Sequence, residues 1–273
     1  FDQCEPRWIG LDCDEDGMRP DAVRAALAER PAFVYVIPDF DNPAGRRMSL
    51  ERREALLDEA ARNDVLVIED APYRELRFEG DPLPTLHELA PERVVHVGTL
   101  SKTLAPGLRL AWLAGPRPVL ELVERAKQAS DLHTSTFVQA VALEAVADGA
   151  LERRLPALRT HYRSQRDALT GALRDELGDR FSFQPAPGGM FLWGRLANDV
   201  DASDLLRVAV GEGVTFVPGA AFYPADGPVN RMRLSYSLPT PERLRTAARR
   251  LRVAQARVDA AAGRDGAAAG AAG

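Results

Sequence analysis

Short apolar runs and amphipathic segments alternate along residues 1–115 of the chain. A continuous apolar run between turn residues is typical of a buried parallel strand, and apolar residues three and four apart are typical of a covering helix. We expect strands at Arg7–Leu11, Phe33–Ile37, Val65–Ile68 and Val94–Val97. We expect helices at Pro20–Glu29, Ser49–Arg62 and Thr85–Leu89. This alternation predicts an α/β fold with a mostly parallel sheet.

From Pro116 onward the pattern changes to long helices followed by short strands. The expected helices are Val119–Ala129, Thr136–Ala147, Leu151–Leu177, Ser203–Glu212 and one that opens at Thr240-Pro241. The expected strands are Phe181–Gln184, Met190–Arg195, Val214–Val217 and Arg231–Ser237. We predict a large domain at 1–115, connecting helices at 116–149, a smaller α+β domain at 150–256 and a disordered Ala/Gly tail at 257–273.

Polar side chains follow three of the predicted parallel strands. They are Asn42 after the first, Asp70 and Tyr73 after the second, and Thr99, Ser101 and Lys102 after the third. Ligands of open α/β sheets bind at the carboxyl ends of the strands. These side chains therefore predict a binding site on one edge of the sheet.

Lys102 lies in a hydroxyl-rich turn between two apolar runs, which is an unusual place for a charge. A desolvated lysine has a lowered pKa, so its amine is free to attack a carbonyl carbon. Arg109 follows closely, and arginine offers a planar fork of donors that suits a phosphate. Lys102 and Lys127 are the only lysines among 35 basic residues, so Lys102 is less easily explained as a generic surface cation. The alternative interpretation is a solvated loop, but together these groups meet the needs of pyridoxal phosphate (PLP).

Composition excludes several classes of protein. The chain has 273 residues, a formal net charge of -5 and 45% hydrophobic residues, which argues against nucleic acid as a main partner. No apolar run approaches the roughly 20 residues that span a bilayer. The two cysteines and four scattered histidines show no metal-binding spacing, so we expect no metal site and a cytoplasmic location. No Gly-x-Gly-x-x-Gly motif follows a strand, which argues against a nicotinamide dehydrogenase.

In order and spacing, several motifs resemble those of the class I/II aminotransferases, PLP enzymes of fold type I. The first are Asn42-Pro43-x-Gly45, Asp70-x-x-Tyr73, Ser101-Lys102 and Pro106-Gly107-x-Arg109. The others are Pro187-Gly188-Gly189-Met190-Phe191-x-Trp193, Gly213-Val214-x-Phe216-x-Pro218-Gly219 and Arg233-Leu234-Ser235-Tyr236-Ser237. The sequence is most similar to the branch with 2-aminoadipate and broad-range amino-acid aminotransferases. This resemblance implies a mostly parallel sheet with helices on both faces and a smaller C-terminal α+β domain.

The resemblance assigns the chemistry to four side chains. Lys102 is expected to form a Schiff base with PLP and to move the proton during transfer. Asp70 is expected to pair with the pyridine nitrogen, and Tyr73 and Asn42 to bind the phenolic oxygen of the ring. Alone, Asp70 reads equally well as a helix cap and Asn42 as a turn residue before proline.

The remaining expected contacts concern phosphate and substrate. Thr99, Ser101 and Arg109 are expected to bind the phosphate, although Arg109 alone could be a surface cation. Arg233 is expected to bind the substrate α-carboxylate, with Asn42 also facing the substrate. Arg231 lies two residues away on the same strand face, so position alone does not separate it from Arg233.

The resemblance implies transfer of an amino group between an L-amino acid and a 2-oxo acid by a homodimer. Two departures are Asp41, where glutamine is frequent, and Ala71, where an acid is frequent. We also expect the chain to lack the N-terminal part of the family's large domain, with a phosphate-binding loop and an aromatic ring that stacks on PLP. The alternatives are the effector domain of a PLP-dependent transcriptional regulator, other PLP chemistry such as β-elimination or decarboxylation, and an inactive fragment.

Overall fold

The computed structural model of the chain describes the backbone of residues 5–270 and the side chains of residues 5–261. The chain forms two compact units. The first comprises the chain up to Asn42, Arg46–Thr160 and Pro187–Gly189. The second comprises Pro43–Gly45, His161–Ala186 and the chain from Met190 onward. All of the predicted site residues except Arg233 belong to the first unit.

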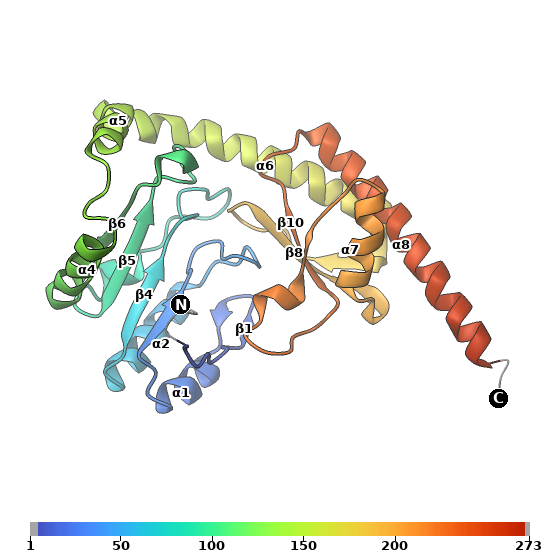
Figure 1. Ribbon diagram of the computed structural model, residues 1–273, viewed down its shortest axis with the longest axis horizontal. Helices are drawn as coiled ribbons and strands as arrows, with labels where there is room; N and C mark the ends of the chain where they lie inside the picture. The colour runs from blue at the N-terminus through green and yellow to red at the C-terminus, as the bar shows by residue number, and fades with distance from the viewer. Residues whose placement is uncertain (1–4, 271–273) are drawn as a thin grey trace. The chain divides into compact units, whose positions relative to one another are not determined.

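A four-stranded sheet forms the centre of the first unit (Figure 1). Its strands, in spatial order, are β3 (Phe33–Val36), β4 (Leu66–Asp70), β5 (Val94–Thr99) and β6 (Ala111–Ala114). The first three are parallel, whereas β6 returns antiparallel to β5. The predicted parallel strands are therefore present, and they are adjacent in the sheet.

Three helices cover one face of this sheet: α1 (Pro20–Ala28), α2 (Leu50–Arg62) and α3 (Leu86–Leu89). Local sequence explains where they begin, since α1 has proline in its first turn and the Ser49 side chain accepts a hydrogen bond from the Arg52 amide. Thr85 and Glu88 form a reciprocal capping box at the start of α3. Val23, Leu27, Leu56, Val34, Val67 and Val94 form part of the buried core between helices and sheet.

The strand expected at Arg7–Leu11 is wrong, because residues 5–12 form no strand. Only Leu11 of this segment packs against the core, whereas Trp8 is exposed. The first strands are instead β1 (Cys13–Asp14) and β2 (Gly17–Met18), a two-residue antiparallel pair. A short apolar run without a neighbouring strand gains no ladder hydrogen bonds, and it remains irregular.

Helices α4 (Arg117–Ser130) and α5 (Thr136–Val146) are poorly covered. Among their residues only Ala142 is buried. The exposed large apolar side chains of this region are Trp112, Leu113, Leu122, Val123, Leu132, Phe137, Val141 and Leu143. We call these residues the α4–α5 apolar surface.

The second unit is built on an antiparallel sheet, with the long helix α6 (Ala150–Leu177) entering from the first unit. Its strands, in spatial order, are β7 (Phe181–Phe183), β8 (Phe191–Leu196), β10 (Arg231–Ser235) and β9 (Val217–Pro218). Buried and less buried residues alternate along β8 and β10, as expected for a sheet covered mainly on one face. Leu192, Leu196 and Met232 point into a core shared with α7 (Ala202–Gly211) and α8 (Pro241–Gly270).

One expectation for this unit differs from the structure, because the strand expected at Val214–Val217 is reduced to β9. The backbone of α8 is helical to Gly270. The domain limits expected from the sequence, with the Ala/Gly tail at 257–273, stay predictions. Residues 271–273 of that segment lie outside the described residues. Among the described helices, none is both long and apolar enough to cross a membrane.

Candidate active site

Asp70 is the last residue of β4, and the sheet register places it beside Val97 of β5. Two residues later β5 ends at Thr99. Tyr73 follows Asp70 by three residues and is buried. The parallel register therefore brings the end of β4 and the end of β5 to one edge of the sheet, as the sequence predicts.

A tight turn after β5 carries Lys102. The Thr99 hydroxyl lies 2.9 Å from both the Ser101 hydroxyl and the Leu110 carbonyl oxygen. The Ser101 amide donates to Thr99 Oγ1 at 3.1 Å. These bonds fix the two hydroxyl groups next to each other, and they leave Lys102 half-buried at the following position.

Arg109 ends a short 3₁₀ turn (Pro106–Leu108) in the left-handed conformation, with φ of 51°. Non-glycine residues adopt this region rarely, and such strain is concentrated at functional sites. The guanidinium of Arg109 is exposed at the start of the return strand. It lies in the same connection as Lys102, and its contact with a phosphate stays a prediction.

Asn42 follows a loop that is strongly anchored to the first unit. Phe40 is buried in the left-handed conformation, with φ of 59°. Asp39 accepts a hydrogen bond at 2.7 Å from the fully buried Arg53. Asp41 accepts one from the Arg46 amide at 2.7 Å and one from its guanidinium at 3.0 Å. The departure from glutamine at Asp41 therefore has a local structural role.

Sequence reasoning missed Tyr35, whose hydroxyl donates to Oδ2 of Asp70 at 2.5 Å. Burial of the hydroxyl and then the hydrogen bond and negative charge of Asp70 raise the pKa of Tyr35 well above its ordinary value. A signal was available, because Tyr35 is the one polar side chain in an otherwise apolar run.

Glu69 lies on the opposite face of β4, where it is fully buried. It accepts hydrogen bonds from the Leu86 amide at 2.8 Å, the His87 amide at 3.2 Å and His96 Nδ1 at 2.9 Å. Burial opposes ionisation, but the bonds from His96 and the two amides outweigh it and lower the pKa of Glu69. Glu69 thus links α3 to β5 by hydrogen bonds, on the face of the sheet opposite to the Asp70 side chain.

Arg233 lies on β10 in the second unit, opposite Trp193 of β8. Its guanidinium carbon lies 4.2 Å from the ring centre of Phe191 and 4.9 Å from that of Phe222. Such stacking orients the planar fork of an arginine.

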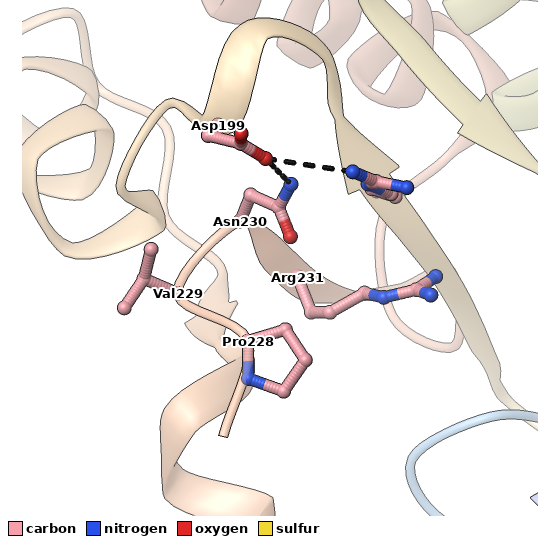
Figure 2. Close-up of a pocket in the computed structure, with 6 residues that line it drawn as sticks. Asp199, Pro228, Val229, Asn230 and Arg231 are labelled. Atoms are coloured by element: carbon pink, nitrogen blue, oxygen red, sulfur yellow. Dashed lines mark hydrogen bonds and ion pairs between the residues drawn. The ribbon is translucent and has the colours of Figure 1, made fainter. Parts of the chain in front are cut away.

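Arg231 occupies a different environment, opposite Arg195. It lines a recess of about 370 Å³ (Figure 2). In this recess Asn230 donates to Asp199 at 2.9 Å, and Arg195 pairs with Asp199 at 3.4 Å. Aromatic stacking therefore separates Arg233 from Arg231, which sequence position did not.

Comparison with known proteins identifies one family that matches most of this chain. Residues 5–251 match the family described as aminotransferase class I and II. The chain belongs to this family. It is 37% identical over 90% of its length to aromatic-amino-acid aminotransferase 1 of Thermococcus litoralis, of which it covers 60%. It is 38% identical over 85% of its length to 2-aminoadipate transaminase of Thermus thermophilus, of which it covers 59%.

A solved structure confirms the predicted α/β fold of fold type I. The α-aminoadipate aminotransferase LysN of Thermus thermophilus, complexed with N-(5'-phosphopyridoxyl)-L-leucine, superposes with a TM-score of 0.89. It is 36% identical, and the match covers 93% of this chain and 67% of that one. Members of the family use PLP. The chain spans about 60% of the length of the curated relatives that it matches.

Proposed function

We propose that the protein is a PLP-dependent aminotransferase that transfers an amino group between an L-amino acid and a 2-oxo acid. The observation that carries this proposal is the placement of Asp70 and the Thr99–Lys102 turn at the ends of adjacent parallel strands. The membership of the chain in the aminotransferase family supports it.

The donor set fits PLP, which needs an amine, a phosphate clamp and an acceptor for its ring N–H. Lys102 provides the amine, and the paired hydroxyls of Thr99 and Ser101, with Arg109, provide donors for the phosphate. Asp70 provides the acceptor. When bound, PLP supplies an electron sink that stabilises negative charge on the substrate Cα. Groups of metal-ligating side chains are absent from the described part of the chain, so the donors favour an organic cofactor.

The chain's own residues carry out binding and proton movement. Lys102 would hold the cofactor through its amine and would move the proton at the substrate Cα. Asp70 would keep the ring nitrogen protonated, while Asn42 and Tyr73 would bind the ring oxygen. Arg233 binds the α-carboxylate through two parallel hydrogen bonds.

The substrate class in this proposal is coarse: an L-amino acid and a 2-oxo acid. Relatives named for aromatic amino acids and for 2-aminoadipate match this chain at similar identity, so neither is preferred. A homodimer and a cytoplasmic location stay predictions.

The second candidate function is the effector domain of a regulator. The HTH-type transcriptional regulator YdfD of Bacillus subtilis is 31% identical over 90% of this chain, which covers 51% of it. Such a domain also holds a lysine and an acid at these positions if it binds PLP, but it has no need to complete the amino transfer. The half-reaction with an amino acid therefore separates the two candidates.

The first test is the visible absorption of the purified chain with PLP, beside Lys102→Ala and Lys127→Ala. Lys127 is the control for Lys102, because both side chains are half-buried. The Lys127 amine bonds to Oδ2 of Asp131 at 2.8 Å. We expect a cofactor band in the wild type and in K127A but none in K102A, and we expect L-amino acids to bleach it.

The remaining outcomes decide against parts of the proposal. A band that persists in K102A contradicts the role of Lys102. A band that amino acids shift without bleaching favours the regulator or other PLP chemistry. A wild-type chain that shows no band contradicts the proposal for this chain.

A further inference from the structure

Tyr35 and Asp70 lie diagonally across neighbouring parallel strands. Tyr35 pairs with Ile68, so Asp70 is two positions further along β4 and its side chain faces the same way. On β3, Val34 and Val36 point into the buried core, whereas Tyr35 points to the other face and is 43% exposed. The core packing of β3 thus does not depend on the Tyr35 hydroxyl.

The contact between the two side chains is short and strongly polar. Tyr35 Oη lies 2.5 Å from Asp70 Oδ2, in the range of charge-assisted O–H···O⁻ bonds. Because the pKa of Tyr35 is raised, by burial first and by Asp70 second, the proton stays on the phenol. In this contact the phenol is therefore the donor, and it occupies one of the two carboxylate oxygens.

We propose that Tyr35 is a positioning residue of the cofactor site, which holds Asp70 through Oδ2 and so presents Oδ1 to the protonated ring nitrogen of PLP. This inference rests on the proposed function. A carboxylate held by one strong bond has a fixed orientation, so less conformational entropy is lost when the second oxygen accepts a bond. Tyr35 acts on the cofactor only through Asp70.

A double-mutant cycle of Tyr35→Phe and Asp70→Asn tests this coupling. The readout is the dissociation constant of PLP, measured by cofactor absorbance, and circular dichroism checks that each variant is folded. We expect Y35F to raise the dissociation constant about tenfold when Asp70 is present, as for loss of a hydrogen bond to a charged group. In the D70N background we expect Y35F to add less than about twofold, because the coupled partner is already altered.

Tyr223→Phe is the matched control, because Tyr223 is a similarly exposed tyrosine of the second unit, outside the proposed site. We expect Y223F to bind PLP like the wild type. An equal loss from Y35F in both backgrounds would mean that Tyr35 contacts the cofactor directly or acts through packing, and it overturns the proposal. Unchanged affinity in Y35F overturns it as well.

A second measurement needs no cofactor, so it separates failure of this inference from failure of the proposed function. Tyrosine absorbance is titrated to alkaline pH in the wild type and in Y35F. The difference between the two curves reports the ionisation of Tyr35. We expect Tyr35 to ionise at higher pH than an ordinary tyrosine, and at lower pH in D70N than in the wild type, because the carboxylate charge is absent. An identical titration in D70N overturns the coupling, whether or not the chain binds PLP.

Discussion

The backbone of Gly188 is in close contact with two other segments of the first unit. A Cβ atom at this position would lie 2.6 Å from the Leu76 carbonyl oxygen and 2.6 Å from the ring of Phe40. Phe40 is buried, so its ring cannot move into solvent. The glycine pair of the Pro187–Gly189 motif is thus explained by close packing on the loop that carries Asn42.

Gly188→Ala is predicted to lower the free energy of unfolding by about 1–3 kcal/mol, as expected for overpacking. Gly171 provides the control, because it lies inside α6 with nothing within 4 Å of its Cβ position. Gly171→Ala is predicted to raise stability by about 0.5–1 kcal/mol through helix propensity. Urea unfolding measures both, and equal effects in the two variants would contradict the packing argument.

Residue types and positions at strand ends were enough to predict Lys102, Asp70 and the hydroxyl turn. Tyr35 was not predicted, because its partner lies 35 positions away in sequence and only the register of β3 with β4 brings them together. The separate surroundings of Arg231 and Arg233 were also beyond the sequence, since they depend on rings from β8 and the 3₁₀ turn Gly219–Phe222.

At the scale of elements, the parallel strands and α2 were predictable because long apolar patterns and a serine cap mark them. The two-residue strands β1, β2 and β9 were not, because so short a segment contains no periodicity. Glu69 illustrates another limit, since the sequence gives no sign that α3, β4 and β5 meet at one carboxylate.

The stability that Glu69 contributes is predicted to depend on pH. Its folded pKa is lowered, so this contribution is fully present above its unfolded pKa and is lost as pH falls through the folded value. Between about pH 6 and pH 3, the free energy of unfolding of the wild type should therefore fall more steeply than that of Glu69→Gln. The difference in stability between the two proteins should narrow over this range.

The measurement is urea unfolding at several pH values, with Glu92→Gln as an exposed control just before β5. The control should follow the wild type at every pH. If the free energies of unfolding of the wild type and E69Q changed with pH in parallel, the buried hydrogen bonds would not favour the charged form of Glu69.

At the scale of the whole molecule, family membership rests on nearly the entire chain, whereas the chain covers about 60% of its relatives. The α4–α5 apolar surface contains eight exposed large apolar side chains, from Trp112 to Leu143. Phe137 and Val141 lie one helical turn apart on α5, so they share a face. Surfaces of this kind promote association.

Phe137→Ser is predicted to reduce self-association of the chain, measured as the concentration dependence of sedimentation. Because Phe137 is 76% exposed, the free energy of unfolding should change by less than about 0.5 kcal/mol. Glu92→Ser, an exposed substitution outside the α4–α5 apolar surface, is the control and should leave association unchanged. Identical sedimentation of F137S and the wild type would exclude this face from association.

The scarcity of lysine gives the chain a chemical property of its own. Lys102 and Lys127 are the only side-chain amines in the sequence, and Lys127 is engaged by both carboxylate oxygens of Asp131. Amine-directed reagents therefore meet only two side chains, which are similarly half-buried, besides the α-amine of the chain. Arginine, which supplies nearly all the remaining positive charge, does not react with them. With only two lysines, covalent labelling followed by peptide mapping can follow the proposed catalytic amine, with Lys127 as an internal reference.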